Sequence, residues 1–278
     1  MSKILITGAG GFLGVRASAY FKEHGWQVVD CDHKTLDITD LQAVQEVFQK
    51  EKPQYVLHCA AISDTGYSQE HPDLSEAINL HGTEHVAAAC AACKAKLVYL
   101  SSDQVYNGNS EMYALPEDIA LDPKNVYGVH KLQAERSVAD ICPDGVGLRL
   151  TWLYDRPDSR FRMNRNLLVN LKQAAESGQM LKGAVHELRG ITYVWDAVEN
   201  LEKCFTLPGG VYNYGCENPM NTYETLRAAA EICGYDADRL VQKDETFYRN
   251  LSMDTKKIRA YGIEFPETVE GVRRAVRR

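Results

Sequence analysis

The sequence predicts an α/β protein with a doubly wound parallel sheet and a smaller, mixed α/β C-terminal part. In its first half, the 278-residue chain alternates strand-like apolar runs with helical stretches. This alternation is typical of a parallel sheet with right-handed crossovers. A glycine-rich turn also joins the first strand to the first helix, and the chain is long enough to bury a large core.

The predicted strands of the first half are short and mostly apolar. KILIT, at the start of the chain, is continuously apolar, as expected for a strand that is buried on both faces. Four similar runs follow it. The predicted strands are residues 3–7, 26–32, 54–61, 96–102 and 145–152.

Helical stretches separate these strands. The first ends near His24, where Gly25 is a stop signal. The second covers residues 38–52, with Thr39 as its candidate N-cap and an apolar face of helical period. Residues 73–95 form a third, long helix, and residues 126–141 form a fourth.

The second half is less regular. It contains a predicted strand at 210–215 and helices at 166–178, 195–205, 221–234, 254–262 and 267–276. We expect residues 1–152 to form a dinucleotide-binding Rossmann domain, to which a later segment near 190–214 returns. Residues 153–278 then form mainly the substrate-binding part. No clear linker separates the two parts, so a ligand between them is the default expectation.

Composition limits the possible function classes. A formal charge of -7 argues against nucleic-acid binding. The only Cys-x-x-Cys pair, Cys90 and Cys93, has neither a second pair nor a histidine at zinc spacing, so we expect no metal site. We find no secretory signal and no apolar run of membrane-spanning length, and we expect a cytoplasmic protein with reduced thiols.

The glycine turn predicts a nucleotide site. Gly8, Gly11 and Gly14 follow the first strand and open the first helix, which continues through Phe12 and Leu13. Glycines allow a tight turn and a close approach to a pyrophosphate, whose charge the helix N-terminus favours.

The end of the second strand bears on the choice of cofactor. Asp32 lies 18 residues beyond Gly14, where an acidic residue binds the adenosine ribose and repels a 2′-phosphate. His33 and Lys34 follow directly and would instead suit that phosphate. We therefore expect NAD(H) or NADP(H), with a preference for NAD(H). Asp37 and Ile38 are candidates for the adenine side, although an aspartate before a helix is commonly a cap or turn residue.

The fourth strand and the following helix carry candidate catalytic groups. Ser102 ends the strand, at the edge where parallel sheets bind ligands. Tyr127 and Lys131 are four residues apart and share a helix face. We expect the lysine ammonium to lower the tyrosine pKa from its usual value of about 10, as general acid–base catalysis requires. Ser102 would hold a carbonyl oxygen and Tyr127 would protonate it.

The glycine turn, LSSDQVY and YGVHK resemble the extended short-chain dehydrogenase/reductases, and the resemblance covers nearly the whole chain. The chain is most similar to the dTDP-4-dehydrorhamnose reductase branch, which reduces the 4-keto group of a nucleotide-linked deoxysugar with NAD(P)H. The segments that carry this similarity are LDITD, CAAISD, AINLHGT, SSDQVYNG, VYGVHK, LRLTWLY, GVYNYG and MDTKKIRAYGIEFP.

The resemblance implies roles for individual residues. Ser102, Tyr127 and Lys131 become the catalytic triad, and Lys131 also binds the nicotinamide ribose. Asn79 positions Lys131 through water, with a purely structural role as the alternative. The cofactor also contacts Cys59, Ala60 and Ala61.

Residues on the substrate side are assigned in the same way. Related 4,6-dehydratases have an Asp-Glu pair after the hydroxyl residue, where this chain has Asp103 and Gln104. A glutamine amide takes up no proton, so dehydration is disfavoured, whereas epimerisation is not excluded. The resemblance places the substrate diphosphate near Asn166, Arg189 and Arg249. The remaining substrate-side candidates are Ser63, Asp103, Gln104 and Trp152.

The sequence departs from the branch pattern at some positions, so the resemblance alone does not identify the substrate. The chain has His58-Cys59-Ala60 where the branch has Asn-Ala-Ala, and Ile191-Thr192 where it has Pro-Thr. We expect a carbonyl reductase whose small-molecule substrate is a 4-keto nucleotide sugar, in a possible homodimer. The alternatives are an epimerase of the same fold and a non-catalytic regulatory subunit that resembles the methionine adenosyltransferase beta subunit.

Overall fold

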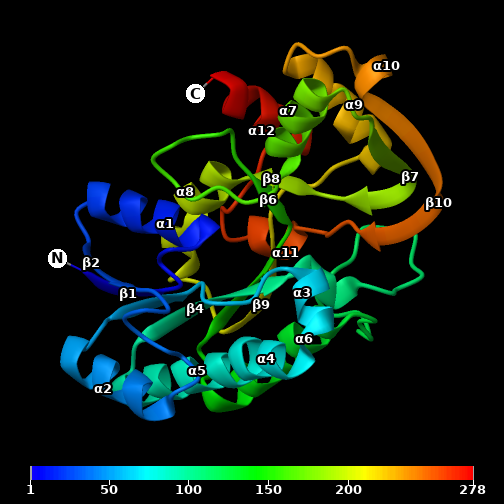
Figure 1. Cartoon of the computed structure of the whole chain (residues 1–278). Helices are drawn as coiled ribbons and strands as arrows, with labels where there is room; N and C mark the ends of the chain where they lie inside the picture. Colours follow the sequence, from blue (N-terminus) through cyan, green and yellow to red (C-terminus); the bar gives the residue numbers. More distant parts are fainter. Residues whose placement is uncertain (1, 278) are drawn as a thin grey trace.

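A six-stranded parallel sheet forms the centre of the protein (Figure 1), whose computed structural model describes residues 2–277. The strand order is β2-β1-β3-β4-β5-β9, so the chain begins inside the sheet and winds towards both edges. The strands are β1 (Lys3–Thr7), β2 (Gln27–Cys31), β3 (Tyr55–His58), β4 (Lys96–Ser102), β5 (Val146–Leu150) and β9 (Gly210–Tyr214).

Helices cover both faces of this sheet. α1 and α8 contact each other on one face, and α2, α5 and α6 lie side by side on the other (Figure 1). A buried apolar cluster fills each interface. The helical segments around the sheet are α1 (Phe12–Glu23), α2 (Leu41–Glu51), α3 (Thr65–Glu70), α4 (Pro72–Glu76), η1 (Ala77–His81), α5 (Gly82–Cys93), η2 (Asp103–Tyr106), α6 (Val126–Ile141) and α8 (Val194–Cys204).

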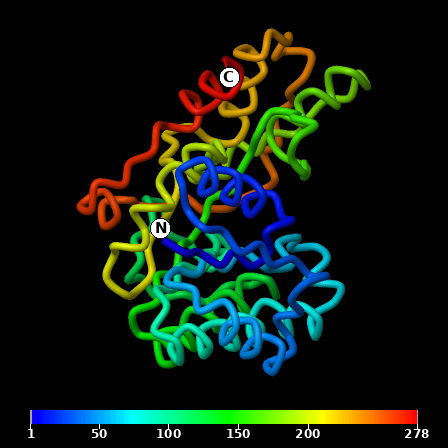
Figure 2. Tube along the Cα trace, turned by 90° about the vertical axis from the view of Figure 1, so that its left-hand side faces the viewer, coloured from blue at the N-terminus to red at the C-terminus, as the bar shows by residue number. Residues whose placement is uncertain are grey.

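The second part of the molecule lies at the carboxyl edge of the sheet. It contains two further parallel strand pairs, β7 (Leu181–Arg189) with β10 (Val241–Leu251), and β6 (Trp152–Tyr154) with β8 (Ile191–Tyr193). Figure 2 shows that the C-terminal end of the chain also lies in this part. Its helices are α7 (Leu167–Ser177), α9 (Thr222–Ile232), α10 (Ala237–Leu240), α11 (Lys256–Arg259) and α12 (Thr268–Arg277).

Most predicted elements of the first half are present, with three corrections. The N-cap of α2 is Asp40, whose carboxylate accepts a hydrogen bond from the Ala43 amide, whereas the Thr39 hydroxyl bonds Asp37. The predicted long helix at 73–95 is divided into α4, the π-helical segment η1 and α5. The predicted strand at 145–152 ends at Leu150, and Trp152 begins β6.

Strands β7 and β10 were not predicted from the sequence. The two pair in parallel although their paired residues lie about 60 positions apart. β9, which was predicted, completes the central sheet beside β5. The expected division into two domains stays a prediction. No helix within residues 2–277 is both long and apolar enough to cross a membrane.

A buried ion pair joins α1 to the second part. The Arg16 Nε donates to Asp155 Oδ2 at 2.8 Å, and the two side chains are 0% and 3% exposed. Arg16 also donates to the backbone oxygens of Phe12 and Arg162 and packs against the Phe161 ring. The segment after β6 is thereby held against the helix that begins at the glycine turn.

We predict that Asp155→Ala lowers the free energy of unfolding by about 3–5 kcal/mol, because it leaves the Arg16 guanidinium buried without its counter-ion. Urea denaturation measures this loss. Asp30→Ala is the control, since it removes the β2 carboxylate from an exposed pair with Lys22, which lies on α1 like Arg16; such pairs contribute about 0–1 kcal/mol. Equal losses in both variants would contradict the prediction.

Candidate active site

Two glycines at the junction of β1 and α1, Gly8 and Gly14, have no room for a side chain. Gly8 has a φ of +65°, and a Cβ atom there would lie 2.6 Å from the Ala60 nitrogen. A Cβ atom on Gly14 would lie 2.2 Å from the Gly8 carbonyl oxygen. Gly11 is the N-cap of α1 and provides no side-chain cap, so the first-turn N–H groups at Phe12 and Leu13 suit an anionic ligand. These residues fit the pyrophosphate of a dinucleotide.

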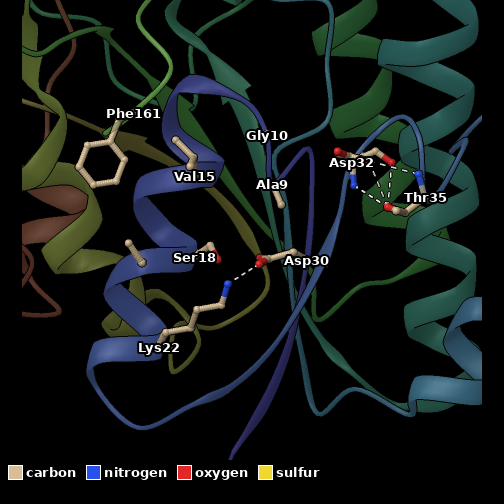
Figure 3. Close-up of a pocket in the computed structure, with 10 residues that line it drawn as sticks. Ala9, Gly10, Val15, Ser18, Lys22, Asp30, Asp32, Thr35 and Phe161 are labelled. Atoms are coloured by element: carbon tan, nitrogen blue, oxygen red, sulfur yellow. Dashed lines mark hydrogen bonds and ion pairs between the residues drawn. The ribbon is translucent and has the colours of Figure 1, made fainter. Parts of the chain in front are cut away.

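The end of β2 forms a polar turn across from α1, with Ala9 and Gly10 between the two (Figure 3). The Asp32 Oδ1 accepts hydrogen bonds from the Lys34 and Thr35 amides, and these bonds lower the pKa of Asp32. A cavity of about 430 Å³ extends along α1 from Asp32 to Lys22, and Phe161 of the second part also lines it. His33 and Lys34 are both exposed.

Asp37 and Ile38 take part in local packing. The Asp37 carboxylate accepts hydrogen bonds from the amide and hydroxyl of Thr39. Asp37 thus has the role of a turn residue, which was the alternative to a contact with adenine. Ile38 is buried, and a Cβ atom on Gly82 would lie 2.6 Å from its Cδ1. Their predicted contacts with adenine stay predictions.

Ser102, Tyr127 and Lys131 come together at the carboxyl end of β4. The Ser102 hydroxyl interacts with the Tyr127 hydroxyl, accepts from the Gln104 amide and donates to Asp103 Oδ1. The Lys131 Nζ lies 5.9 Å from the centre of the Tyr127 ring and donates to the Leu100 carbonyl oxygen at 2.8 Å. All three side chains are buried.

Burial determines the direction of both pKa shifts in this group. Desolvation raises the pKa of Tyr127, and its hydrogen bond with Ser102 opposes that rise only in part. This is opposite to the direction expected from the sequence, because the Lys131 ammonium bonds the Leu100 carbonyl while the phenol is buried. Desolvation lowers the pKa of Lys131 to about 8, against the opposing charge of Glu135.

Asn125 positions the helix that carries Tyr127 and Lys131. Its Oδ1 accepts a hydrogen bond from the Gly128 amide at 2.6 Å and thereby caps α6. Its Nδ2 donates to Gln104 Oε1 at 3.0 Å. Asn125 is not among the site residues predicted from the sequence, although an asparagine directly before a helix is a recognisable capping signal.

Asn79 lies in the π-helical segment η1 and is fully buried. Its side chain accepts from the Ile62 amide and donates to the Ile62 carbonyl and to Ser75. These contacts favour the structural alternative, and its action on Lys131 stays a prediction. Cys59, Ala60 and Ala61 follow β3 and are partly buried, beside the turn at Gly8.

His58, which departs from the branch pattern, is part of a buried hydrogen-bond chain. Its Nδ1 lies 2.6 Å from the Thr7 hydroxyl and its Nε2 lies 3.1 Å from the Thr83 hydroxyl, which donates to the Asn79 carbonyl. Burial lowers the pKa of His58 to about 3. A neutral imidazole thus links the ends of β1 and β3 to η1.

The candidate substrate side contains a cluster of paired charges. Arg189 donates to Asp103 Oδ2 at 2.8 Å, and Arg249 Nε donates to Glu187 Oε1 at 2.8 Å. The Arg189 guanidinium also lies over the Trp152 ring. Glu187 is not among the residues predicted from the sequence, because β7 was not predicted. In a strand, its spacing of two from Arg189 places both side chains on one face.

Other substrate-side candidates have local contacts. Asn166 is fully buried and caps α7 by accepting from the Leu168 and Val169 amides. Gln104 donates to Asp103 and accepts from Asn125. Ser63 is exposed, just before the cap of α3. Their contacts with a substrate stay predictions.

Comparisons with known proteins agree with the resemblance found in the sequence. The family model described as RmlD substrate binding domain matches residues 2–276. Methionine adenosyltransferase 2 subunit beta from Bos taurus is 32% identical over 94% of this chain and 83% of its own length. The spore coat polysaccharide biosynthesis protein SpsK from Bacillus subtilis is 29% identical over 85% of this chain and 81% of its own length.

A solved structure confirms the expected fold class. The crystal structure of dTDP-4-dehydrorhamnose reductase from Bacillus anthracis in complex with NADP superimposes with a TM-score of 0.89. It is 24% identical, and 99% of each chain is covered.

We predict that Asn125→Ala lowers the free energy of unfolding by about 1 kcal/mol, because α6 loses its cap. The Gly128 amide loses its acceptor, so hydrogen exchange at this amide becomes faster. Asn125→Asp retains a capping oxygen and is expected to protect Gly128 nearly as well as the wild type. Unchanged exchange at Gly128 in Asn125→Ala would show that the cap contributes nothing to α6.

Proposed function

The chain belongs to the RmlD substrate binding domain family, and on this premise we propose that it is an NAD(P)H-dependent carbonyl reductase whose substrate is a 4-keto nucleotide sugar. The observation that carries the proposal is the contact between the hydroxyls of Ser102 and Tyr127, with Lys131 one helical turn further along α6. This group lies at the same sheet edge as the glycine turn.

The raised pKa of Tyr127 supports its role as the proton donor in the reductive direction. A phenol that stays protonated at neutral pH can donate to a carbonyl oxygen on which negative charge develops. Ser102 holds that oxygen through its hydroxyl. Lys131 supplies positive charge beside the phenol, and a bound nicotinamide would supply hydride to the carbonyl carbon.

We assign the cofactor to the first half of the chain, with Gly8, Gly11 and Gly14 at its pyrophosphate. Among the described residues, the hydrogen bonds to the Asp32 carboxylate end on Oδ1. Its Oδ2 is therefore the atom that we assign to a ribose hydroxyl. This assignment favours NAD(H), because a 2′-phosphate would meet the Asp32 charge.

The substrate is assigned to the charged cluster around Arg189. Arginine binds a diphosphate well, because its planar fork donates two hydrogen bonds at once. Trp152 lies beside Arg189 and offers an apolar surface. Gln104 in place of a carboxylate base argues against dehydration, whereas an epimerase would use the same triad.

A second candidate function is that of a regulatory subunit. It is favoured by the similarity to methionine adenosyltransferase 2 subunit beta, which is named as a subunit and matches 94% of this chain. A protein of this kind would bind a nicotinamide cofactor without turning over a ketone. Homodimer formation and a cytoplasmic location stay expectations.

We predict that Tyr127→Phe lowers the turnover of 4-keto nucleotide sugars by about 10²–10⁴-fold while NADH binding persists, because only the donated proton is lost. NADH and NADPH oxidation against a panel of ketones measures this loss and the cofactor preference. If neither cofactor is oxidised by the wild-type protein, the reductase proposal fails. A cofactor that stays bound through purification would then favour an epimerase, and stimulation of a partner enzyme would favour a regulatory subunit.

We predict that the rate of reduction falls as the pH rises through about 8, because Lys131, whose pKa is about 8, loses its proton and its positive charge. Steady-state rates between pH 6 and pH 10 measure the midpoint. The residual activity of Lys131→Arg is expected to show no fall in rate near pH 8, since arginine stays protonated throughout this pH range. The same fall in both proteins would assign it to another group.

A further inference from the structure

A row of alternating charges extends from the catalytic hydroxyl to strand β10. Ser102 donates to Asp103, Asp103 accepts from Arg189, and the Arg189 Nη1 lies 4.0 Å from Glu187 Oε1. Glu187 in turn accepts from Arg249, which pairs with it in register across the two strands. The row thus contains two cations and two anions.

Glu187 is held firmly in this row. It is 6% exposed, and the Thr222 hydroxyl donates to its Oε2 at 2.8 Å. Burial opposes ionisation, but Arg249 and Arg189 outweigh it and keep the pKa of Glu187 below its usual range. Glu187 is therefore a carboxylate at neutral pH.

The two arginines differ in what remains available to a ligand. The Nε and Nη2 of Arg249 both donate to Glu187. The Nε of Arg189 is buried and has no hydrogen-bond partner within residues 2–277. A buried donor without an acceptor is costly. The same guanidinium bonds Asp103, which in turn accepts from Ser102, so the unused donor indicates an anion acceptor at this site.

We propose that Glu187 is an internal counter-ion that competes with the substrate diphosphate for Arg249 and Arg189, and so limits how tightly the protein holds a nucleotide sugar. This inference rests on the proposed function and deepens it. Glu187 touches neither the reacting atoms nor the cofactor in this account. It acts through the arginines and is a positioning residue.

Glu187 would compete with a diphosphate because the charges of the row already balance. The paired side chains of the row sum to no net charge, and a nucleoside diphosphate brings two or more negative charges into a partly buried region. Like charges repel strongly there, because water screens them little. The ligand must therefore take the donors of Arg249 from Glu187, which stays bonded to Thr222.

The test compares nucleoside diphosphate binding by the full-length wild-type protein and Glu187→Gln. Isothermal titration calorimetry with dTDP and with UDP, in the presence of saturating NADH, gives the dissociation constants. Glutamine keeps the shape and one acceptor oxygen but removes the charge. We expect Glu187→Gln to bind at least one of the two ligands about tenfold more tightly, and to lower KM more than it changes kcat.

Two further variants make the result specific. Glu270→Gln removes one negative charge from an exposed pair with Arg273 on α12 and is expected to leave the dissociation constants unchanged. Thr222→Val removes the hydroxyl that holds Glu187 and is expected to weaken binding, because the carboxylate is then free to move fully onto the arginines. It also provides a test if Glu187→Gln fails to fold.

The outcomes separate this inference from the proposed function. If the wild type binds dTDP or UDP and Glu187→Gln binds it equally well or more weakly, the counter-ion role is wrong while the reductase proposal stands. If neither protein binds a nucleoside diphosphate, the inference fails together with the nucleotide-sugar substrate. Ketone turnover that depends on Tyr127 would then still identify a reductase.

Discussion

The close contact of backbone at Gly8 is the constraint on which the arrangement of the site depends. The chain leaves β1 with a positive φ and passes so near to Ala60 that a side chain would overlap the Ala60 backbone. This contact sets the N-terminus of α1 against the end of β3, and β4 lies on the other side of β3. The nucleotide turn and the hydroxyl of Ser102 therefore share one edge of the sheet, and the distance between them is fixed by the spacing of parallel strands.

The sequence predicts the first half well because its signals are local. Continuous apolar runs identify the buried strands, and the predicted helix at 126–141 has the observed bounds. The second half carries weaker signals. β10 contains the run QKDETFYRN, most of which is exposed, so neither apolar continuity nor alternation marks it. The π-helical segment η1 has no local signal, because it depends on how Asn79 bonds the backbone of Ile62.

The same distinction applies to the candidate site. The identities of Ser102, Tyr127 and Lys131 follow from their positions in the predicted strand and helix. The pKa shift of Tyr127 does not, because its direction depends on how far the phenol is buried and on the carbonyl that Lys131 bonds instead. The pairing of Glu187 with Arg249 depends on the register of two strands, which spacing in the sequence cannot provide. The way in which charges pair at the candidate substrate side therefore depends on the tertiary structure.

The pairing of β7 with β10 also affects the order in which the protein can be assembled. Glu187 and Arg249 are 62 residues apart, and ribosomes add about 5–20 residues per second. A nascent chain therefore exposes Glu187 about 3–12 s before its partner is synthesised. The strands of the central sheet up to β5 are synthesised before this interval, whereas β7 is synthesised before the strand with which it pairs. The pairing of β7 with β10 is consequently a late event, and until it occurs β7 is an unpaired strand that a chaperone could protect.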